Sequence, residues 1–460
     1  MPVRRSPRSF GRTAGLRPLS ASTVAAKAEA GGLFLERKHI MGLAGLVALA
    51  GAVALAAPHR SPTLSRKPQS VAHLRLAKLS LSARHDVDYA LLDARLKRMA
   101  AKPTMVGLAV GVVEHGRITF LSGYGETAAG SGERVTPQTV FRWASCSKGL
   151  AATMIAKLAE QGKIDLNAPV ARYSTSLHLP NYGEQSATVV DLLSHRLGLY
   201  RNAYDNKLEE GQDPNVLRAS LSQLNAVCAP GTCWDYQNVA YDASSEMVAR
   251  ATNKPYPDAV QSMLFDPIGM RSASVTRRGL ESAPSWARPH SVGRRVLEGS
   301  DNYYKVPAAG GVNSNIKDFA LWMIAQTGGM PDVLSPKLLD TIHQPRVKTP
   351  GEQGRMRKFA ERVRDPWYGL GWRSYDYAGH RIVGHRGGVT GYRSLILFDP
   401  VTKSGVVALW NSNTSQPGGL EFEVMDMLYH LPFRDWMELD KRGTPEVAGT
   451  GDEVSSGNPG

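Results

Sequence analysis

Ser145-Cys146-Ser147-Lys148 lies where an apolar stretch containing a tryptophan, Phe141 to Ala144, turns into an amphipathic helical pattern. Residues three apart on a helix share a face, so this spacing places the Ser145 hydroxyl within reach of the Lys148 amine. A serine hydroxyl is a weak nucleophile until a base takes its proton, and a buried lysine amine can be that base because desolvation disfavours its charged form. The start of the helix adds N–H groups and a dipole that favour negative charge near Ser145. The stretch predicts a nucleophilic serine with a lysine partner.

Ser-x-x-Lys alone is a weak signal, because it arises by chance about once or twice in a chain of this length. A second copy, Ser314-Asn315-Ile316-Lys317, opens another helical pattern that runs from Ile316 to Gln326. Ser314 or Asn315 fits the N-cap of that helix, with Asp318 in its first turn. We interpret the second copy as structural.

Two further motifs follow Ser145 in order along the chain. Tyr236-Gln237-Asn238 precedes a helical stretch, Val239 to Ala251. His385-Arg386-Gly387-Gly388 stands between two predicted strands, 381–383 and 392–398. What separates the Ser145 motif from its second copy is this ordered series of partners.

The order Ser-x-x-Lys, Tyr-x-Asn and His-x-Gly resembles that of the penicillin-recognising serine hydrolases. A tyrosine in the second motif is similar to the class C β-lactamase branch, with its D-Ala-D-Ala carboxypeptidase and esterase relatives. The similarity runs from about Asp86 to Leu431 and includes the stretches 192–199 and 308–312. Three motifs in this order are a strong signal, although each one separately is not.

The resemblance implies a role for each matching position. Ser145 attacks a carbonyl and becomes acylated, while Lys148 and Tyr236 share the proton transfers. Asn238 hydrogen-bonds the substrate amide and orients Lys148. The third motif lines the substrate site through His385, Gly387 and Gly388, and the backbone N–H groups of Ser145 and Gly388 form the oxyanion hole.

Three departures from the family pattern concern the substrate. His385 stands where β-lactamases usually carry lysine, so a fixed cation is missing at neutral pH, and we expect His385 to supply one only as the pH falls. Arg386 replaces a small hydroxyl residue and either restores that charge or points to solvent. Arg196-Leu197-Gly198 replaces a Thr/Ser-Gly pair. The preceding His195 is expected to end a helix and bond backbone rather than take part in chemistry.

The cysteines suggest one disulfide. Cys228-Ala229-Pro230-Gly231-Thr232-Cys233 contains a Pro-Gly turn that can bring Cys228 and Cys233 together, the alternative being two free thiols. The bridge would stiffen the approach to Tyr236. Cys146 has no evident partner, and we expect it to be buried and reduced.

The formal net charge of +14 is concentrated near the N-terminus, since residues 1–70 hold 11 Lys/Arg and 2 Asp/Glu. The charge therefore does not indicate a nucleic-acid partner. Ile40 to Ala57 is a run of 18 residues without a charge, and Ala54-Leu55-Ala56 offers a cleavage site. We interpret residues 1–57 as a signal peptide, or as an uncleaved signal anchor that is the protein's only contact with the membrane. The expected location is the periplasm or the extracellular space.

The remaining chain divides into a linker over 58–84, a catalytic domain over 85–435 and a disordered tail over 436–460. Predicted strands at 106–113, 117–123, 368–375, 381–383, 392–398 and 405–410 lie at both ends of the domain, with a helix-rich region from 150 to 328 between them. Helices are also expected at 86–101 and 421–430. The fold class is therefore α+β: an antiparallel sheet built from both terminal segments, flanked by helices, with an all-α insertion. The site lies at the junction of sheet and insertion.

These features predict an exported serine hydrolase that acts through an acyl-enzyme on an amide or ester of a small molecule or peptide. The resemblance points to β-lactamase-like or D-Ala-D-Ala peptidase-like chemistry. The alternatives are a sensor that binds peptidoglycan or β-lactams without turnover, and a small-ester esterase. No cofactor and no metal is expected, because His-Glu-x-x-His, Gly-x-Ser-x-Gly and Walker motifs are absent from the sequence and ligand residues are not clustered.

Overall fold

The computed structural model describes residues 85–440. The predicted leader (1–57), the whole predicted linker (58–84) and positions 441–460 of the predicted tail lie outside the described residues. Among residues 85–440, none of the helices has both the length and the apolar character needed to cross a membrane.

An antiparallel sheet of eight strands forms the frame of the domain, in the order β2-β1-β10-β9-β8-β7-β6-β5. The strands of this sheet, with the short pair β3 and β4 that stands apart from it, are as follows: β1 Gly107–Glu114, β2 Arg117–Gly125, β3 Phe141–Arg142, β4 Asn313–Ser314, β5 Val347–Lys348, β6 Val363–Tyr368, β7 Arg373–Tyr377, β8 His380–Val389, β9 Tyr392–Asp399 and β10 Ser404–Trp410. The first strand pairs with the last along its length, from Leu108 opposite Trp410 to Val113 opposite Gly405. The sheet is thus assembled from segments at the two ends of the domain, with β2 and β5 as its edge strands.

The sheet separates two hydrophobic cores. Along β10, Val406, Ala408 and Trp410 pack into one core, and Val407 and Leu409 pack into the other. Alternate residues of a strand point to opposite faces, so a strand that is apolar at nearly every position is one covered on both sides. This explains why β1 and β10 are continuous apolar runs in the sequence.

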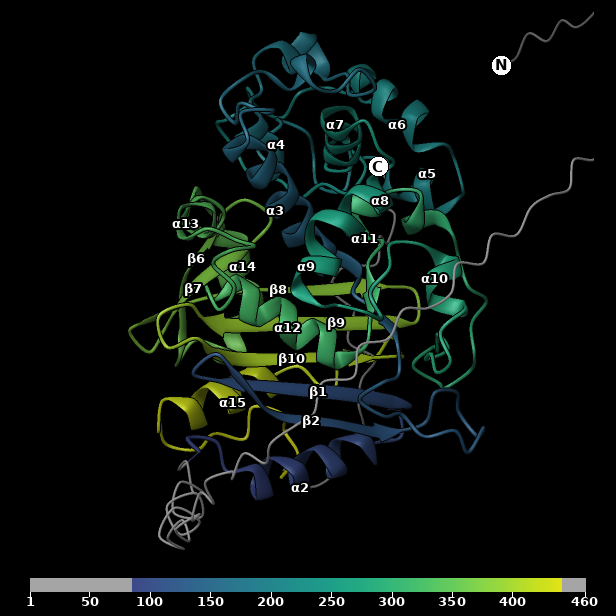
Figure 1. Ribbon diagram of the computed structural model, residues 1–460, viewed down its shortest axis with the longest axis vertical. Helices are drawn as coiled ribbons and strands as arrows, with labels where there is room; N and C mark the ends of the chain where they lie inside the picture. Colours follow the sequence, from purple (N-terminus) through teal and green to yellow (C-terminus); the bar gives the residue numbers. More distant parts are fainter. Residues whose placement is uncertain (1–84, 441–460) are drawn as a thin grey trace, which may run out of the picture. The chain divides into compact units, whose positions relative to one another are not determined.

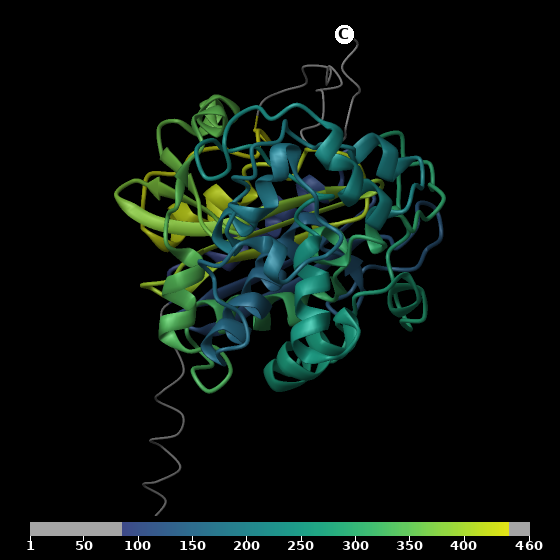
Figure 2. The same cartoon turned by 90° about the horizontal axis from the view of Figure 1, so that it is seen from above.

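Helices cover both faces of the sheet, and the helices of the middle region lie past the side of the sheet where β8 is drawn (Figure 1). Helices α2 and α15 pack on one face and α12 on the other. The α-helices are α2 Tyr89–Ala100, α3 Ser147–Glu160, α4 Val189–Leu193, α5 Asp205–Glu209, α6 Pro214–Ser220, α7 Ala243–Thr252, α8 Tyr256–Val260, α9 Asp266–Ile268, α10 Arg277–Glu281, α11 Pro307–Gly310, α12 Ile316–Gln326, α13 Pro336–His343, α14 Pro350–Arg355 and α15 Leu420–Leu428. Short 3-10 turns lie at Ala144–Cys146 (η1), Val170–Arg172, Pro180–Gln185, Leu221–Gln223, Asn302–Tyr304 and Arg357–Phe359, and Gln261–Phe265 is a π-helical turn. Figure 2, turned by 90°, shows the helices of the middle region lying over the sheet.

The predicted fold class is confirmed: an antiparallel sheet from both terminal segments carries an all-helical insertion between β3 and β4. The strands predicted at 106–113 and 117–123 are present and form a hairpin, whose two turn residues, His115 and Gly116, have φ of 50° and 76°. Positive φ at both positions matches the right-handed twist of the strands. Helix α2 begins at Tyr89 because Asp88 caps it by accepting the N–H of Leu91 at 3.0 Å.

Three predicted boundaries are wrong. The strand expected over 368–375 is two strands, because the Gly369 N–H donates to the Trp372 carbonyl at 2.7 Å and the chain reverses there. The strand expected over 381–383 is β8, which runs to Val389 and contains the whole third motif. The tail begins later than 436, since Trp436 is 7% exposed and its indole N–H donates to Asp426 Oδ2 at 2.8 Å.

Candidate active site

Ser145 lies in a tight turn between strand β3 and helix α3. Its predecessor Ala144 has a left-handed backbone, with φ of 48°, a conformation that persists in a non-glycine residue only where the surroundings impose it. The adjacent Trp143 provides that constraint: its indole N–H donates to Ser314 Oγ at 2.8 Å, and its ring lies 4.2 Å from the ring of Phe319 on α12. The turn presents Ser145, which is 7% exposed, at the start of α3.

The second Ser-x-x-Lys copy has the structural role predicted for it. Asn315 caps α12 by accepting the N–H of Asp318 at 2.9 Å. Ser314 is fully buried and accepts the indole hydrogen of Trp143, so this serine supports the turn that carries Ser145.

Lys148 is fully buried one helical turn after Ser145. Its Nζ donates to Asn238 Oδ1 at 2.5 Å and to the carbonyl of Ala309 at 3.1 Å. The same Nζ lies 4.5 Å from the centre of the Tyr236 ring. The first and second motifs therefore meet at one lysine amine, which is positioned by an amide oxygen, a backbone oxygen and an aromatic face.

Asp205, at the start of α5, is a site residue that the sequence did not reveal. Its carboxylate Oδ2 accepts a hydrogen from Asn238 Nδ2 at 2.6 Å, and the residue is buried. This bond fixes the orientation of the amide, because the nitrogen must face Asp205 and the oxygen must then face Lys148. Asp205 belongs to no recognisable motif, and only the fold places it beside Asn238.

The third motif lies on β8 against the Ser145 turn. Strand β7 pairs with β8 only as far as Gly384, whereas β9 continues along it to Val389. A side chain at Gly387 would begin 2.3 Å from the Trp143 carbonyl oxygen and 2.9 Å from the Ser145 nitrogen. Glycine at this position lets β8 approach the nucleophile turn.

His385 lies at one end of a chain of hydrogen bonds that runs through Tyr368 to His195. The backbone groups bonded at the two ends of this chain determine which ring nitrogen carries each proton. The Gln237 N–H donates to His195 Nδ1 at 3.2 Å, so a neutral His195 carries its proton on Nε2 and donates to the Tyr368 oxygen at 3.1 Å. The Tyr368 hydroxyl then donates to His385 Nε2 at 3.1 Å. His385 keeps its proton on Nδ1 and donates to the carbonyl of Arg386 at 2.6 Å. A proton added to either ring would place two hydrogens in one of these bonds.

The electrostatic surroundings also favour the neutral form of both His195 and His385. Burial lowers the pKa of His385 well below its ordinary value, and the cations Arg373 and Lys148 lower it further. Burial, followed by Lys148, also lowers the pKa of His195. The expectation that His385 becomes cationic as the pH falls through the range near neutrality is therefore wrong, because the charged imidazolium would be desolvated and repelled by two cations. His195 bonds the backbone as predicted, but its ring also packs on Tyr236, with 4.4 Å between ring centroids.

The other two departures from the family pattern, at Arg386 and Arg196, supply no cation to the site. Arg386 lies on the opposite face of β8 from His385, where its guanidinium is paired with Glu421 of α15 and its Nε donates to Oε1 at 2.8 Å. Arg196 is paired with Asp191 at 2.6 Å. Both arginines are structural.

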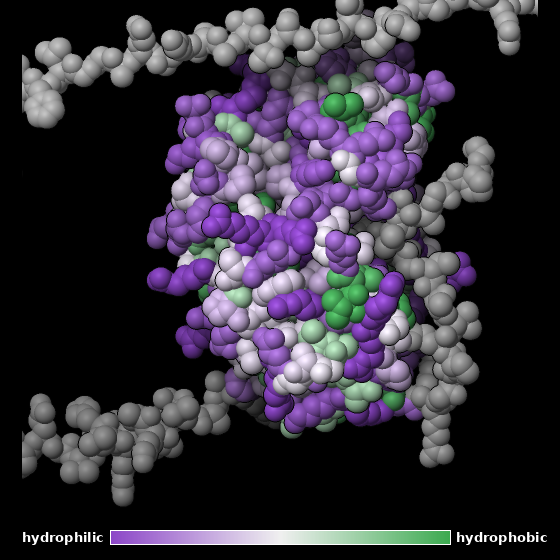
Figure 3. All heavy atoms as spheres, turned by 90° about the vertical axis from the view of Figure 1, so that its right-hand side faces the viewer, coloured by the Kyte–Doolittle hydropathy of each residue, from purple (hydrophilic) through white to green (hydrophobic). Residues whose placement is uncertain are grey.

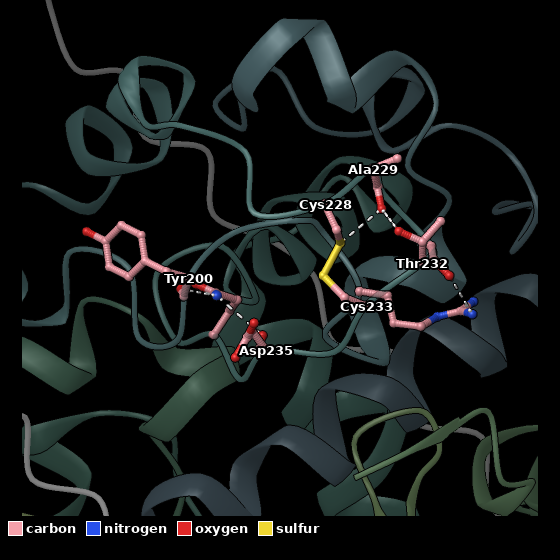
Figure 4. The surroundings of a disulfide bond; sticks show 9 residues. Tyr200, Cys228, Ala229, Thr232, Cys233 and Asp235 are labelled. Carbon is pink, nitrogen blue, oxygen red and sulfur yellow. Dashed lines mark hydrogen bonds between the residues drawn. A yellow bond between two sulfur atoms is a disulfide. The ribbon is translucent and has the colours of Figure 1, made fainter. Parts of the chain in front are cut away.

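Cys228 and Cys233 form a disulfide in the loop that leads to Tyr236 (Figure 4). The loop is also tied to the preceding segment, since the Gly231 N–H donates to the Arg196 carbonyl at 2.7 Å. Cys146 lies outside the disulfide as a thiol that is 1% exposed. Its Sγ contacts the carbonyl oxygen of His385 at 3.4 Å, so this cysteine packs between the first and third motifs.

Reduction of the bridge should lower stability and loosen the approach to Tyr236. A closed ring of this size stabilises the folded state by about 2 kcal/mol through loop entropy. We expect dithiothreitol to lower the melting temperature of the wild-type protein, with no effect on the Cys228→Ser/Cys233→Ser double variant, measured side by side. If both proteins melt at the same temperature with and without reductant, the bridge does not contribute to stability.

The structure brings together Ser145, Lys148, Tyr236, Asn238 and His385, with Gly387 and Gly388 on the strand beside them. Sequence reasoning missed Asp205, Tyr368 and Arg373. Arg373 pairs with Glu352 at 2.8 Å and lies 5.7 Å from the ring of Tyr236. Within the described part of the chain, no group of three His, Cys, Asp or Glu side chains is arranged to hold a metal ion. The arrangement is suited to acyl transfer from a carbonyl compound to a serine, with a lysine and a tyrosine to move the proton.

The family is shown by comparison with known proteins. The sequence model of the family described as Beta-lactamase matches residues 92–425. The chain belongs to the beta-lactamase family. That match spans all three motifs and both terminal segments of the sheet.

Curated relatives of this beta-lactamase-family chain include several hydrolases. The unguisins hydrolase ungD' of Aspergillus campestris is 28% identical over 71% of this chain and 61% of its own length. The D-alanyl-D-alanine-carboxypeptidase/endopeptidase AmpH of Escherichia coli K12 is 29% identical over 47% of this chain and 56% of its own. Esterase EstB of Burkholderia gladioli is 30% identical over 40% and 50%. The matches cover about half to three fifths of these relatives, and the family includes enzymes that cleave amides and esters.

Solved structures support the fold. The octameric penicillin-binding protein homologue of Pyrococcus abyssi aligns with a TM-score of 0.67 at 21% identity, over 75% of this chain and 78% of the other. A D-stereospecific amidohydrolase of Streptomyces sp. aligns with a TM-score of 0.57 at 21% identity, over 71% and 95%.

Proposed function

We propose that this chain is an exported serine hydrolase that cleaves an ester or an internal amide, one with no carboxylate next to the scissile bond, through an acyl-enzyme at Ser145. The observation that carries the proposal is the position of the Lys148 amine, one turn after Ser145, bonded to Asn238 and lying against Tyr236. The family comparison supports hydrolysis in general, and the mechanism and the substrate class are inferred from this site.

In acylation, the Ser145 oxygen attacks the substrate carbonyl and its proton passes to the Lys148 and Tyr236 pair. The pair returns the proton to the leaving alcohol or amine as the carbonyl bond to it breaks. The N–H groups of Ser145 and Gly388 stabilise the oxyanion, an effect worth roughly 3–4 kcal/mol for one such donor. Asn238 has a second hydrogen on Nδ2, besides the one given to Asp205, that can bind a substrate carbonyl. In deacylation, water repeats the attack, and the same pair takes its proton and returns it to Ser145.

The neutral state of His385 supports the choice of substrate. A lysine at this position would be a cation for a carboxylate next to the scissile bond, whereas a neutral imidazole offers none. Burial and the neighbouring Arg373 and Lys148 both lower the pKa of His385, so this holds across the range near neutrality. We therefore favour substrates whose scissile bond has no adjacent carboxylate over β-lactams and C-terminal D-Ala-D-Ala peptides.

The proposed export rests on the apolar stretch Ile40 to Ala57 and on the Cys228–Cys233 disulfide, a bond that persists mainly in oxidising compartments. A periplasmic or extracellular location is part of the proposal, with any contact to the membrane made by the N-terminal segment.

Burst kinetics test the proposed activity. We expect 4-nitrophenyl butyrate to give a burst of one nitrophenol per enzyme followed by steady turnover, and a cephalosporin and a D-Ala-D-Ala peptide to turn over at least about tenfold more slowly, as for one lost charge contact. The measurement is kcat/KM for all three substrates on one preparation. A stoichiometric burst without turnover would favour a sensor, and faster turnover of the cephalosporin would contradict the choice of substrate.

A further inference from the structure

A cavity of about 380 Å³ lies beside the candidate active site, between α10, the segment 286–304 and the end of β8. Its walls carry aromatic and cationic side chains, Arg142, Trp286, Arg288, Tyr304 and Tyr392, together with Thr390 and the carboxylates of Glu209 and Glu281. The face of the molecule that carries α10 is otherwise largely hydrophilic, with hydrophobic side chains gathered in small patches (Figure 3). None of these residues belongs to the three motifs.

Arg142 is the most unusual group in this cavity. It is 5% exposed, and no carboxylate among the described residues lies within ion-pair distance of its guanidinium. One nitrogen donates to the Gly310 carbonyl at 3.2 Å, the guanidinium lies 3.9 Å from the centre of the Tyr304 ring, and Nε is buried without a hydrogen-bond partner. A buried guanidinium usually has an anionic partner, because removing an unpaired charge from water is strongly unfavourable.

A second cation of the cavity also has no carboxylate partner within residues 85–440. Arg288 is half-buried, donates to the Trp286 carbonyl at 3.0 Å and lies 3.5 Å from the centre of the Trp286 ring. By contrast, Arg277 at the rim is paired with Glu281 at 2.7 Å. Two positive charges of the wall, those of Arg142 and Arg288, are thus left unmatched by an ion pair.

The cavity adjoins the nucleophile through two shared elements. Helix α11 contacts both sites, since the Ala309 carbonyl accepts from Lys148 and the next carbonyl, that of Gly310, accepts from Arg142. On the other side, Thr390 of the cavity follows β8, two residues after Gly388. A substrate bound at Ser145 and extending along the end of β8 would enter this cavity.

We propose that the cavity is a subsite for a carboxylate of the substrate, held by Arg142 and Arg288 between aromatic side chains on the acyl side of the scissile bond. The inference rests on the proposed function and adds a substrate class to it: esters or amides of acids that carry a second, remote carboxylate. Guanidinium groups bind planar carboxylates through paired hydrogen bonds. Glu209 and Glu281 on the same wall favour a singly charged ligand over a dianionic phosphate.

Two esters with the same leaving group test the subsite. The 4-nitrophenyl monoester of adipic acid carries a free remote carboxylate, and methyl 4-nitrophenyl adipate has the same reacting centre without the charge. We expect wild-type kcat/KM to favour the anionic ester by about tenfold or more, with the glutarate and suberate pairs included to cover the distance. Arg142→Met should bring the ratio close to one. Arg250→Met, which removes the same charge from the surface of α7, should leave the ratio unchanged.

The outcomes separate this inference from the proposed function. Equal kcat/KM for the charged and neutral members of all three pairs in the wild type overturns the subsite while leaving the hydrolase intact. Failure of every ester to acylate Ser145 overturns the proposed function instead. If Arg142→Met does not fold, Arg288→Met provides the decisive ratio, because Arg288 is only half-buried, and an unchanged ratio in that variant contradicts the subsite.

Discussion

Ser145→Ala should abolish covalent labelling by a fluorophosphonate probe and lower kcat/KM for 4-nitrophenyl butyrate by at least about 10⁴-fold, since the bond to the acyl group cannot form without the hydroxyl. The variant should still fold, because the change removes one small atom from a turn that Trp143 holds in place. The measurement is probe incorporation by mass spectrometry together with steady-state hydrolysis.

The second Ser-x-x-Lys copy provides the matched control. Ser314→Ala should retain labelling, although it should cost about 1–3 kcal/mol of stability because the buried indole N–H of Trp143 loses its acceptor. Ser145→Ala should therefore lose labelling and keep its stability, whereas Ser314→Ala should keep labelling and lose stability. Labelling that survives in Ser145→Ala and disappears in Ser314→Ala would exclude Ser145 as the nucleophile.

The sheet was predictable from the sequence where strands are covered on both faces. The apolar runs of β1 and β10 are short and bounded by turn residues, as expected of strands buried on both faces, and Gly116 marks the hairpin turn between β1 and β2. The boundary between β6 and β7 was missed although two glycines mark it: Gly371 has φ of 73°, and the chain reverses where the Gly369 N–H bonds the Trp372 carbonyl.

The active site was only partly predictable from the sequence, because some of its residues belong to motifs and others are placed there only by the fold. The three motifs identify residues that act through their chemical type, and the structure brings those residues together. Placing the third motif in a loop hid the alternation of β8, in which His385 faces the site and Arg386 faces the opposite layer, since adjacent strand residues point to opposite faces. Asp205 and Tyr368 act only through contacts made by the fold, so their identities carry no local signal.

Replacing Lys148 should have the second largest effect on activity. Lys148→Met keeps the length and the apolar stem of the side chain but removes the amine that bonds Asn238 and Ala309. Without a positioned group to take the Ser145 proton, we expect kcat/KM to fall about 10²–10⁴-fold, the usual contribution of general acid–base catalysis. The residual rate should rise steadily with pH, as hydroxide takes over the proton transfer, whereas the wild-type rate should reach a plateau.

Two further variants decide what the amine does. Lys157→Met alters another partly buried lysine of α3 and should leave kcat/KM within about twofold, because its Nζ donates to the Val333 carbonyl, away from the motifs. Lys148→Arg keeps a positive charge but cannot accept a proton, since guanidinium stays charged in proteins. If Lys148 is the base, Lys148→Arg should be as impaired as Lys148→Met while remaining folded by circular dichroism. Substantial activity in Lys148→Arg, with a matching loss in Tyr236→Phe, would instead assign the proton transfer to Tyr236 and leave Lys148 as a fixed charge.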